Sequence, residues 1–292
     1  GKEDTAIALD IRTSVKDTDN SEKIDSVVIK GVPDGFTLSA GSKQPDGSWN
    51  LTEGQLAGLK LNPPANWSGT VNLQVISTSK EQVTLATAGN DEQTLADNTA
   101  STTANIKVTI DGVADKPTLT VDDVWTKEDS AGVQLKIDAK LTDPSETLTV
   151  KIENIDPSWT ITNLAGGTYN AVTKTWSITL APGQNFSGGP TFKSPADSDL
   201  DLTGLTVTAT SAEGNGDSAS RTEDANIFVD AVADAPNLTT SAANGNEGDA
   251  IALNIQTSVK DTDGSEKIDS VVISGVPAGY SLSAGTKQPD GT

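Results

Sequence analysis

The sequence predicts an all-β chain in which antiparallel β-sandwich units repeat in tandem along a rod. Three observations predict it. Residues 1–48 return without a gap as residues 245–292, with 36 of the 48 positions identical. Short segments rich in Val, Ile and Thr alternate apolar and polar residues, which is typical of half-buried strands. Turns rich in Gly, Pro, Asn and Asp separate these segments, as they do in sandwiches.

The repeat has a period of about 122 residues, half of the 244 that separate the two similar copies. A degenerate middle copy, Lys127–Ile152, follows the same pattern with small gaps. The first two copies end alike, as Ala104–Pro117 and Ala225–Pro236. Because Pro cannot continue a central strand, these ends predict domain boundaries. We expect repeats at residues 1–115 and 116–234, and a partial third repeat at 235–292.

Each copy carries enough strand-like segments for a sandwich. The first copy predicts strands at Thr5–Ile11, Asp25–Ile29, Val71–Ile76 and Ala104–Ile110. The second predicts them at Val133–Ala139, Thr147–Ile152, Thr175–Leu180, Leu205–Thr210 and Ala225–Val229. Leading strands open the second and third repeats at Thr118–Asp122 and Asn237–Thr240, and the first repeat lacks one. About seven strands in ~100 residues suit an immunoglobulin-like domain.

Aromatic residues recur between the copies. Trp49 matches Trp176, and Trp67 in the phrase NWSG matches Phe186 in NFSG. We expect these residues to anchor the cores rather than to stack on sugars, because a sandwich core requires large side chains on alternating strands.

Composition excludes several classes of function. The net charge is −21 and the chain has no His, which opposes binding to nucleic acid or to an anionic membrane and favours cations. The absence of Cys excludes disulfides and thiol catalysis, and the absence of His removes the usual general base and zinc ligand. No run of 18 apolar residues is present, so no membrane insertion is predicted.

Acidic residues recur at three places in each repeat: a Glu-Asp turn after the leading strand, the linker, and an Asp-x-Asp loop. In a sandwich, the turn and linker of one repeat face the loop of the next repeat. The first junction therefore collects Glu3, Asp4, Asp111, Asp115, Asp143 and Glu146. The second collects Glu128, Asp129, Asp230, Asp234, Asp261, Asp263 and Glu266.

Carboxylates gathered in this way repel one another. Two unit charges 4 Å apart cost about 4 kcal/mol at an effective dielectric constant near 20. A hard cation relieves the repulsion, and Ca²⁺ takes 6–8 oxygen ligands where Mg²⁺ demands a tighter octahedron. An EF-hand starting at Asp17 is excluded because residue 28 is Val. The alternative that Asp simply favours turns stays open.

At these residues the chain resembles the tandem repeats of RTX-type bacterial adhesins that are exported by type I secretion. The phrases that carry the resemblance are KEDTAIALDI, DTDGSEKIDSVVISGVPAGYSLSAG and VADAP. The middle copy departs from it with DPSE at Asp143–Glu146. The resemblance implies cadherin-like and immunoglobulin-like domains in an extracellular stalk on a bacterial surface. Calcium would rigidify the junctions between neighbouring repeats, and other domains of a longer parent protein would carry the distal ligand.

Three functions are compatible with the sequence. The first is a structural extender that supports cell adhesion or biofilm formation. The second is a ligand-binding adhesin module that recognises glycans or another surface, for which Trp125 and Trp159 are candidates because neither has a counterpart in the other copies. The third is an enzyme, which we do not expect because the acids repeat at domain ends rather than in one cleft. Whether another chain completes the partial third repeat stays open.

Overall fold

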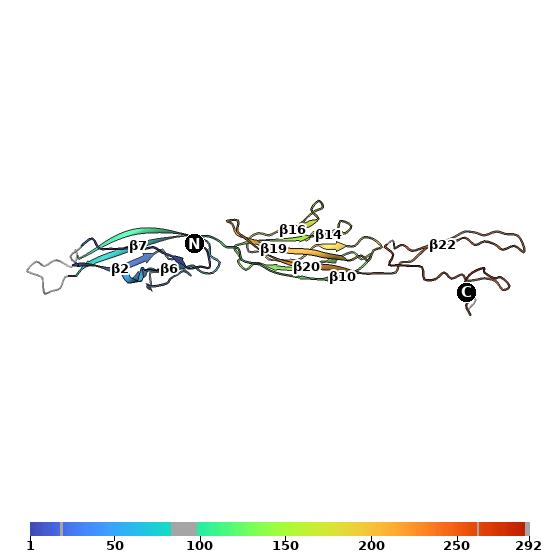
Figure 1. The fold of residues 1–292 in the computed structure, drawn as a ribbon, viewed down its shortest axis with the longest axis horizontal. Helices are drawn as coiled ribbons and strands as arrows, with labels where there is room; N and C mark the ends of the chain where they lie inside the picture. Colours follow the sequence, from blue (N-terminus) through green and yellow to red (C-terminus); the bar gives the residue numbers. More distant parts are fainter. Residues whose placement is uncertain (18–19, 83–97, 262, 290–292) are drawn as a thin grey trace, which may run out of the picture.

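The computed structural model describes residues 1–17, 20–82, 98–261 and 263–289. The chain is elongated, and successive units follow one another along its long axis (Figure 1). We call residues 1–110 the first unit, 118–230 the second and 237–289 the third. No described strand crosses the linkers at 111–117 and 231–236. The division into three repeats, with boundaries near 115 and 234, stays a prediction about folding units.

The first unit is a sandwich of two sheets. A three-stranded sheet has the order β1-β6-β3, and a five-stranded sheet has the order β4-β5-β2-β7-β8. The strands are β1 (Ile7–Ala8), β2 (Glu22–Lys30), β3 (Thr37–Leu38), β4 (Ser42–Lys43), β5 (Trp49–Leu51), β6 (Lys60–Asn62), β7 (Gly69–Glu81) and β8 (Thr99–Ile110). A 3₁₀ turn, η1 (Glu53–Gln55), precedes β6. Among the described residues, no helix is long and apolar enough to span a bilayer.

The second unit is a larger sandwich. Its six-stranded sheet has the order β10-β20-β19-β13-β16-β15, and it faces two three-stranded sheets, β11-β18-β14 and β17-β12-β9. The strands are β9 (Thr118–Asp122), β10 (Val124–Lys127), β11 (Val133–Gln134), β12 (Lys136–Lys140), β13 (Thr147–Glu153), β14 (Thr160–Asn163), β15 (Thr168–Asn170), β16 (Thr175–Thr179), β17 (Phe186–Gly188), β18 (Thr191–Lys193), β19 (Leu202–Ala212) and β20 (Ser218–Asp230). The predicted all-β class of tandem sandwiches is confirmed.

Alternating apolar residues build each core. On β13, the residues Leu148, Val150 and Ile152 are fully buried while their neighbours are partly exposed. Trp49 and Trp176 occupy the same position in the two units, because Trp49 pairs with Ile29 on β2 and Trp176 pairs with Ile152 on β13. Both tryptophans are buried, which confirms their predicted role as core anchors.

The match between Trp67 and Phe186 is wrong. Trp67 precedes β7, and the counterpart of β7 is β19 rather than β17. In the sheet order β7 lies between β2 and β8, and β19 lies between β13 and β20. Phe186 instead lies on β17, beside β12. Both side chains still support a core: Trp67 packs edge-on to Phe36 at 4.8 Å between ring centroids, and Phe186 contacts Trp176 at 5.8 Å.

The predicted strand Val133–Ala139 is divided in the structure. The chain changes sheets at the fully buried Leu135, so β11 pairs with β18 and β12 pairs with β9 and β17. In the first unit the predicted strand Thr5–Ile11 is reduced to β1, which pairs with β6. Residues 9–11 of the predicted strand are not part of any strand in the structure.

The leading segment of the second unit joins both faces of the sandwich. β9 pairs antiparallel with β12, and β10 then pairs parallel with the last strand, β20. This parallel pair was not predicted. In the first unit only a single parallel bridge, between Lys2 and Asp111, occupies the corresponding place.

The third unit carries one described sheet, in which β21 (Asn237–Thr240) pairs antiparallel with β22 (Ile255–Ser258). Its apolar side chains stand largely in solvent: Leu238 is 61% exposed, Val272 69% and Tyr280 71%. The second unit's β9 places the corresponding leucine, Leu119, in the core at 3% exposure. The described third unit therefore has a leading hairpin without a packed core around it.

Candidate metal sites between successive units

In each of the first two units, a Glu-Asp pair ends the segment that runs parallel to the last strand. The amide of Glu3 donates to the carbonyl of Asp111 (3.0 Å), and the amide of Glu128 donates to the carbonyl of Asp230 (3.1 Å). These bonds continue the parallel pairing of the leading segment with the last strand. They place both glutamate side chains beside the first residues of a linker.

The aspartate that follows each glutamate makes a second contact across the end of the unit. Asp4 and Asp129 both have a φ of 56°, a left-handed conformation that Asp adopts more readily than most residues. The Oδ1 atom of Asp4 accepts from the amide of Asn66 (2.9 Å), and that of Asp129 accepts from the amide of Asp197 (3.1 Å). The same backbone bond therefore recurs in both units, with a neutral residue in one and an acid in the other.

At the first junction, glutamates from two units hold the linker. The Oε1 atom of Glu3 accepts from the amide of Val113 at 2.6 Å, and the Oε1 atom of Glu146 accepts from the amide of Asp115 at 2.6 Å. Glu3 belongs to the first unit and Glu146 to the second. The linker backbone is therefore bonded from both sides, at residues two positions apart.

The second junction repeats this arrangement. The Oε1 atom of Glu128 accepts from the amide of Val232, and the Oε1 atom of Glu266 accepts from the amide of Asp234 at 2.8 Å. Glu128 comes from the second unit and Glu266 from the third. The spacing of two linker residues between the paired amides is the same at both junctions.

The other carboxylate oxygens of these glutamates are buried without a hydrogen-bond partner. This holds for Oε2 of Glu3, Glu128, Glu146 and Glu266, and for Oδ1 of Asp261. Glu3, Glu128 and Glu146 are at most 3% exposed, and Asp261 is 8% exposed. A buried carboxylate oxygen without a partner is costly. Each junction therefore presents unsatisfied negative oxygens in a space shielded from water.

Acids from both units meet at the first junction. Glu3, Asp143 and Glu213 each offer one oxygen, and these oxygens lie within 4.8 Å of one another. Ser145 holds Asp143 in place through its amide (2.7 Å) and hydroxyl (2.9 Å). Glu213 comes from the hairpin between β19 and β20, which bonds the linker again where Asp217 accepts from the amide of Ala114 (3.0 Å).

A corresponding cluster forms at the second junction from different residues. Oxygens of Asp129, Asp197 and Asp234 lie within 4.8 Å of one another. Nearby, Asp263 accepts from the amide of Asp199 (3.1 Å), which joins the third unit to the second. The ammonium group of Lys260 approaches Asp234 at 3.8 Å. One cation of the chain itself therefore already lies near this cluster.

Three acids at the first junction, Glu146, Glu3 and Asp115, have a raised pKa. Burial raises the pKa of Glu146 to about 7, against the lowering effect of its bond from Asp115, and the charges of Asp143, Asp115 and Glu213 raise it further. Burial also raises the pKa of Glu3, although its bond from Val113 works in the opposite direction. The pKa of Asp115 rises for the same reason, burial first and neighbouring acids second.

At the second junction, the pKa of Glu128 is raised and the pKa of Asp263 is lowered. The bond from Val232 lowers the pKa of Glu128, but burial and the charges of nearby aspartates outweigh it and raise the pKa overall. Asp263 is exposed, and the amide and hydroxyl of Ser265 lower its pKa to about 2. Asp263 is thus a stable anion at neutral pH, whereas Glu128 gains from a compensating positive charge.

Not every predicted ligand sends its carboxylate into a cluster. Asp111 and Asp230 are exposed and contribute their backbone carbonyls, which bond the two glutamates. Asp4 is exposed and bonds Asn66. In the first copy, Glu22 pairs with Glu81 at the end of β7 that lies away from this junction, and Asp19 is outside the described residues.

Sequence reasoning missed four acids that the structure brings to the junctions: Glu213, Asp217, Asp197 and Asp199. None of them recurs at a matched position of another copy, so comparison of the copies could not find them. The available signal was local. Acids begin and end the segments Glu213–Asp217 and Asp197–Asp199, which stand directly after and shortly before the long strand β19, and such turns lie at the ends of a sandwich.

No protein-family model matches the chain, and no curated protein matches it. Similar solved structures include the extracellular cadherin domains 1–5 of protocadherin gamma B2, at 13% identity over 90% of this chain and 44% of that chain, with a TM-score of 0.32. Another is mouse cadherin-23 EC22-24, at 13% identity over 68% and 53%, with a TM-score of 0.30. A type I cohesin–dockerin complex from Clostridium thermocellum matches at 8% identity over 41% and 97%, with a TM-score of 0.30. At these scores we draw no functional argument from them.

Proposed function

We propose that each junction binds calcium, and that the chain is an extender module of a large bacterial surface adhesin, stiffened by that calcium. One observation carries the proposal: glutamates of adjacent units bond the same linker through one oxygen and bury the other oxygen unpartnered. A cation placed between the units would satisfy those oxygens. It would also remove the repulsion within each acidic cluster.

The donor set favours calcium over other metals. Carboxylate and carbonyl oxygens are the groups available at both junctions, and the chain has neither His nor Cys to attract zinc. Ca²⁺ accepts irregular sets of 6–8 oxygens, whereas Mg²⁺ keeps its waters and demands a regular octahedron. At the first junction Glu3, Asp143, Glu146 and Glu213 would hold the ion. At the second, the holders would be Glu128, Asp129, Asp197, Asp234 and Asp261.

The mechanical consequence follows from where the ligands come from. An ion held by one unit, the linker and the next unit opposes bending at the junction, because bending would separate its ligands. A string of such units keeps its length and carries whatever it joins away from a surface. The resemblance of the repeat phrases to secreted adhesins supports an extracellular role at a bacterial surface, in cell adhesion or biofilm formation, with neighbouring repeats as the immediate partners.

Calorimetric titration with calcium, combined with small-angle scattering in calcium and in EDTA, tests this function. We expect calcium binding that saturates at a small whole number of ions per chain. We also expect the chain to have a larger maximum dimension in calcium than in EDTA. Glu146→Gln should weaken binding at the first junction. Glu223→Gln is the matched control, because Glu223 pairs with Arg221 in the middle of β20, away from both junctions.

Unchanged scattering profiles in EDTA and calcium would overturn the stiffening role. Equal calcium binding by wild type, Glu146→Gln and Glu223→Gln would overturn the site assignment. Magnesium at the same concentration serves as the ion control, and we expect it to give little binding.

A ligand-binding role is the second candidate, and Trp125 favours it. Its indole is 62% exposed and stacks on Phe228 at 5.3 Å between ring centroids, an arrangement able to receive a sugar ring. Trp159 does not contribute, because it is only 6% exposed and belongs to the core. Glycan binding that disappears in Trp125→Ala, with calcium binding unchanged, would establish this role. We propose no enzymatic activity.

A further inference from the structure

The hairpin between β19 and β20 holds the first linker through a neutral side chain as well as through acids. The Nδ2 group of Asn215 donates to the carbonyl of Gly112 at 2.8 Å. The carboxylate of Asp217 accepts from the amide of Ala114 at 3.0 Å. The linker lies so close to the hairpin that a side chain at Gly112 would collide with the carboxylate of Glu213. Hairpin and linker are therefore packed together, although 103 residues separate Asn215 from Gly112.

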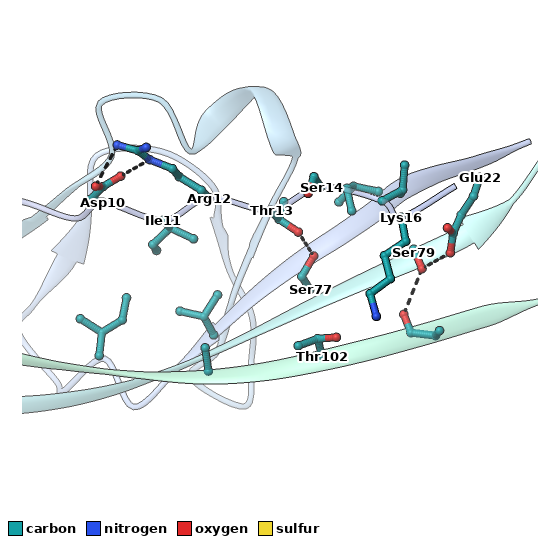
Figure 2. Close-up of a pocket in the computed structure, with 16 residues that line it drawn as sticks. Asp10, Ile11, Arg12, Thr13, Ser14, Lys16, Glu22, Ser77, Ser79 and Thr102 are labelled. Carbon is teal, nitrogen blue, oxygen red and sulfur yellow. Dashed lines mark hydrogen bonds and ion pairs between the residues drawn. The ribbon is translucent and has the colours of Figure 1, made fainter. Parts of the chain in front are cut away.

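Asn215 differs chemically from the other side chains that join distant segments. In the first unit, for example, Thr13 is turned toward Ser77 (Figure 2), and their hydroxyl oxygens lie 2.7 Å apart. Such hydroxyl groups are stable in water. An Asn that is followed by Gly loses its side-chain amide most readily, because Gly has no Cβ to obstruct attack by its own nitrogen. Asn215 precedes Gly216 and is exposed, so water reaches it.

The reaction consumes one water and releases one ammonia. The amide nitrogen of Gly216 attacks Cγ of Asn215, so that an N–Cγ bond forms and the Cγ–Nδ2 bond breaks. Nδ2 leaves as ammonia and takes up the proton that the Gly216 nitrogen gives up. Water then adds to either carbonyl of the succinimide ring and opens it to Asp or to isoaspartate.

Three hydrogen bonds keep the reacting groups from this reaction. The amide of Gly216, which must attack, donates to the carbonyl of Glu213 at 2.9 Å. The Oδ1 atom of Asn215 accepts from the amide of Asp217 at 2.9 Å, and its Nδ2 group bonds Gly112. The first two bonds lie within the hairpin. The third exists only while the linker is in place, so release of the linker frees the leaving group.

The turn by itself explains Gly216 but not the bond to the linker. Gly216 has a φ of 93°, in the region that favours Gly, and Asn-Gly pairs are common in turns. Turn geometry gives no reason for the amide of Asn215 to point at a carbonyl of another segment. That bond makes the reactivity of this pair depend on the junction.

We propose that Asn215 is a site of spontaneous deamidation, protected while the linker is bound to the hairpin, and that its conversion releases the linker. The product places a carboxylate oxygen against the carbonyl oxygen of Gly112, where the amide had supplied a donor. It also adds a negative charge to the hairpin that carries Glu213 and Asp217, which increases the repulsion at the junction. No step requires calcium, so the proposal does not depend on the proposed junction sites.

Peptide mapping of the full-length chain by mass spectrometry, after incubation at pH 8 in EDTA, tests the protection. The chain has two Asn-Gly pairs, and the second is the reference: Asn244 is exposed, and neither it nor Gly245 bonds another described residue. We expect Asn215 to react at least about tenfold more slowly than Asn244, since one hydrogen bond can account for about that factor. In urea the two sites should react at similar rates.

Glu3→Ala weakens the hold on the linker from its other side, because Glu3 bonds the amide of Val113. We expect this variant to deamidate faster at Asn215 and unchanged at Asn244, whereas the matched control Glu223→Gln should change neither. Equal rates at the two sites in the folded chain would overturn the protection. An unchanged rate at Asn215 in Glu3→Ala would overturn the role of the linker, and no reaction at Asn215 in urea would overturn the site itself.

Asn215→Asp tests the release of the linker, and Asn244→Asp is its matched control. Hydrogen exchange at residues 113–115, measured by mass spectrometry in EDTA, reports whether the linker amides stay bonded. We expect exchange there to be at least about tenfold faster in Asn215→Asp than in the natural chain, and unchanged in Asn244→Asp. Equal exchange in the two variants would overturn the release.

Discussion

The two junctions share a backbone arrangement but differ in how deeply it is buried. At both, a glutamate from each side bonds the linker at amides two residues apart. Glu146 at the first junction is fully buried, whereas its counterpart Glu266 at the second is only half-buried. The difference teaches that the linker sets where the carboxylates point, while the body of the next unit sets how strongly they repel.

The physical reason lies in the strands that come after each loop. Glu146 precedes β13, which is central in a six-stranded sheet, and the charge of Glu213 in the β19–β20 hairpin acts on it. The third unit supplies only β21 and β22 among its described residues. The first junction should therefore gain more from a bound cation than the second does, and single substitutions at the two junctions can measure that difference.

Removal of the linker bond should have the largest effect. Glu3→Ala leaves the amide of Val113 without its charged acceptor and removes a ligand of the first site. We expect a loss of about 3 kcal/mol in the free energy of unfolding in calcium, since hydrogen bonds to charged groups contribute about 1.5–3 kcal/mol. Denaturant unfolding followed by tryptophan fluorescence measures it. A loss no larger than that of Glu223→Gln would contradict the role of Glu3 in holding the linker.

Neutralising the buried Glu146 should change the stability of the chain in opposite directions with and without calcium. Glu146→Gln keeps an oxygen for the amide of Asp115 but removes a charge among Asp143, Asp115 and Glu213. In EDTA at pH 8 we expect the variant to be more stable, on the order of 2 kcal/mol. In calcium the order should reverse. Thermal unfolding under both conditions measures this, and Glu266→Gln should show the same crossing with a smaller amplitude.

If Glu146→Gln instead destabilises the chain in EDTA as well, repulsion and burial of the charged Glu146 do not lower the stability of the folded chain. The comparison with Glu266→Gln then also loses its basis, because repulsion would not distinguish the junctions.

The stability of the calcium-free chain should depend on pH. The pKa of Glu146 is raised from 4.5 to about 7 in the folded chain, so between these values the folded state binds more protons than the unfolded state does. The free energy of unfolding therefore falls as pH rises through this range and levels off above it. Unfolding in EDTA from pH 5 to 8 measures the slope. Glu146→Gln should flatten it, and an unchanged slope in that variant would assign it to other acids.

Exchange of one residue should make the calcium affinities of the two junctions more alike, and this is the smallest effect that we expect. Asn66→Asp places at the first junction the acid that Asp197 supplies at the second, and the amide bond to Asp4 is retained. We expect calcium affinity at the first junction to increase by up to about tenfold, or 1.4 kcal/mol. Asp197→Asn should weaken the second junction to a similar extent. Calorimetry measures both, and effects of the opposite sign would exclude these positions from the sites.

Comparison of the copies found the acids that repeat and could not find those that do not. Glu3 and Glu128 were predicted because they stand at matched positions, and their burial beside the linker follows from strand pairing. Asp197 and Glu213 were missed because loops of different length bring them to the junctions. Matching phrases also misled at Trp67 and Phe186, since a match of four residues does not determine which strand they belong to: Trp67 precedes β7, whereas Phe186 lies on β17.

Sequence alone determined the all-β class, the tandem repeat, the core role of Trp49 and Trp176, and the recurrence of acids at the ends of units. These follow from local alternation and from the identity of the copies. Only the tertiary structure decided that the leading segment of the second unit pairs with two sheets and which carboxylate oxygens are buried without a partner. Those properties depend on packing between segments distant in the chain, and a carboxylate becomes costly only where other strands exclude water from it.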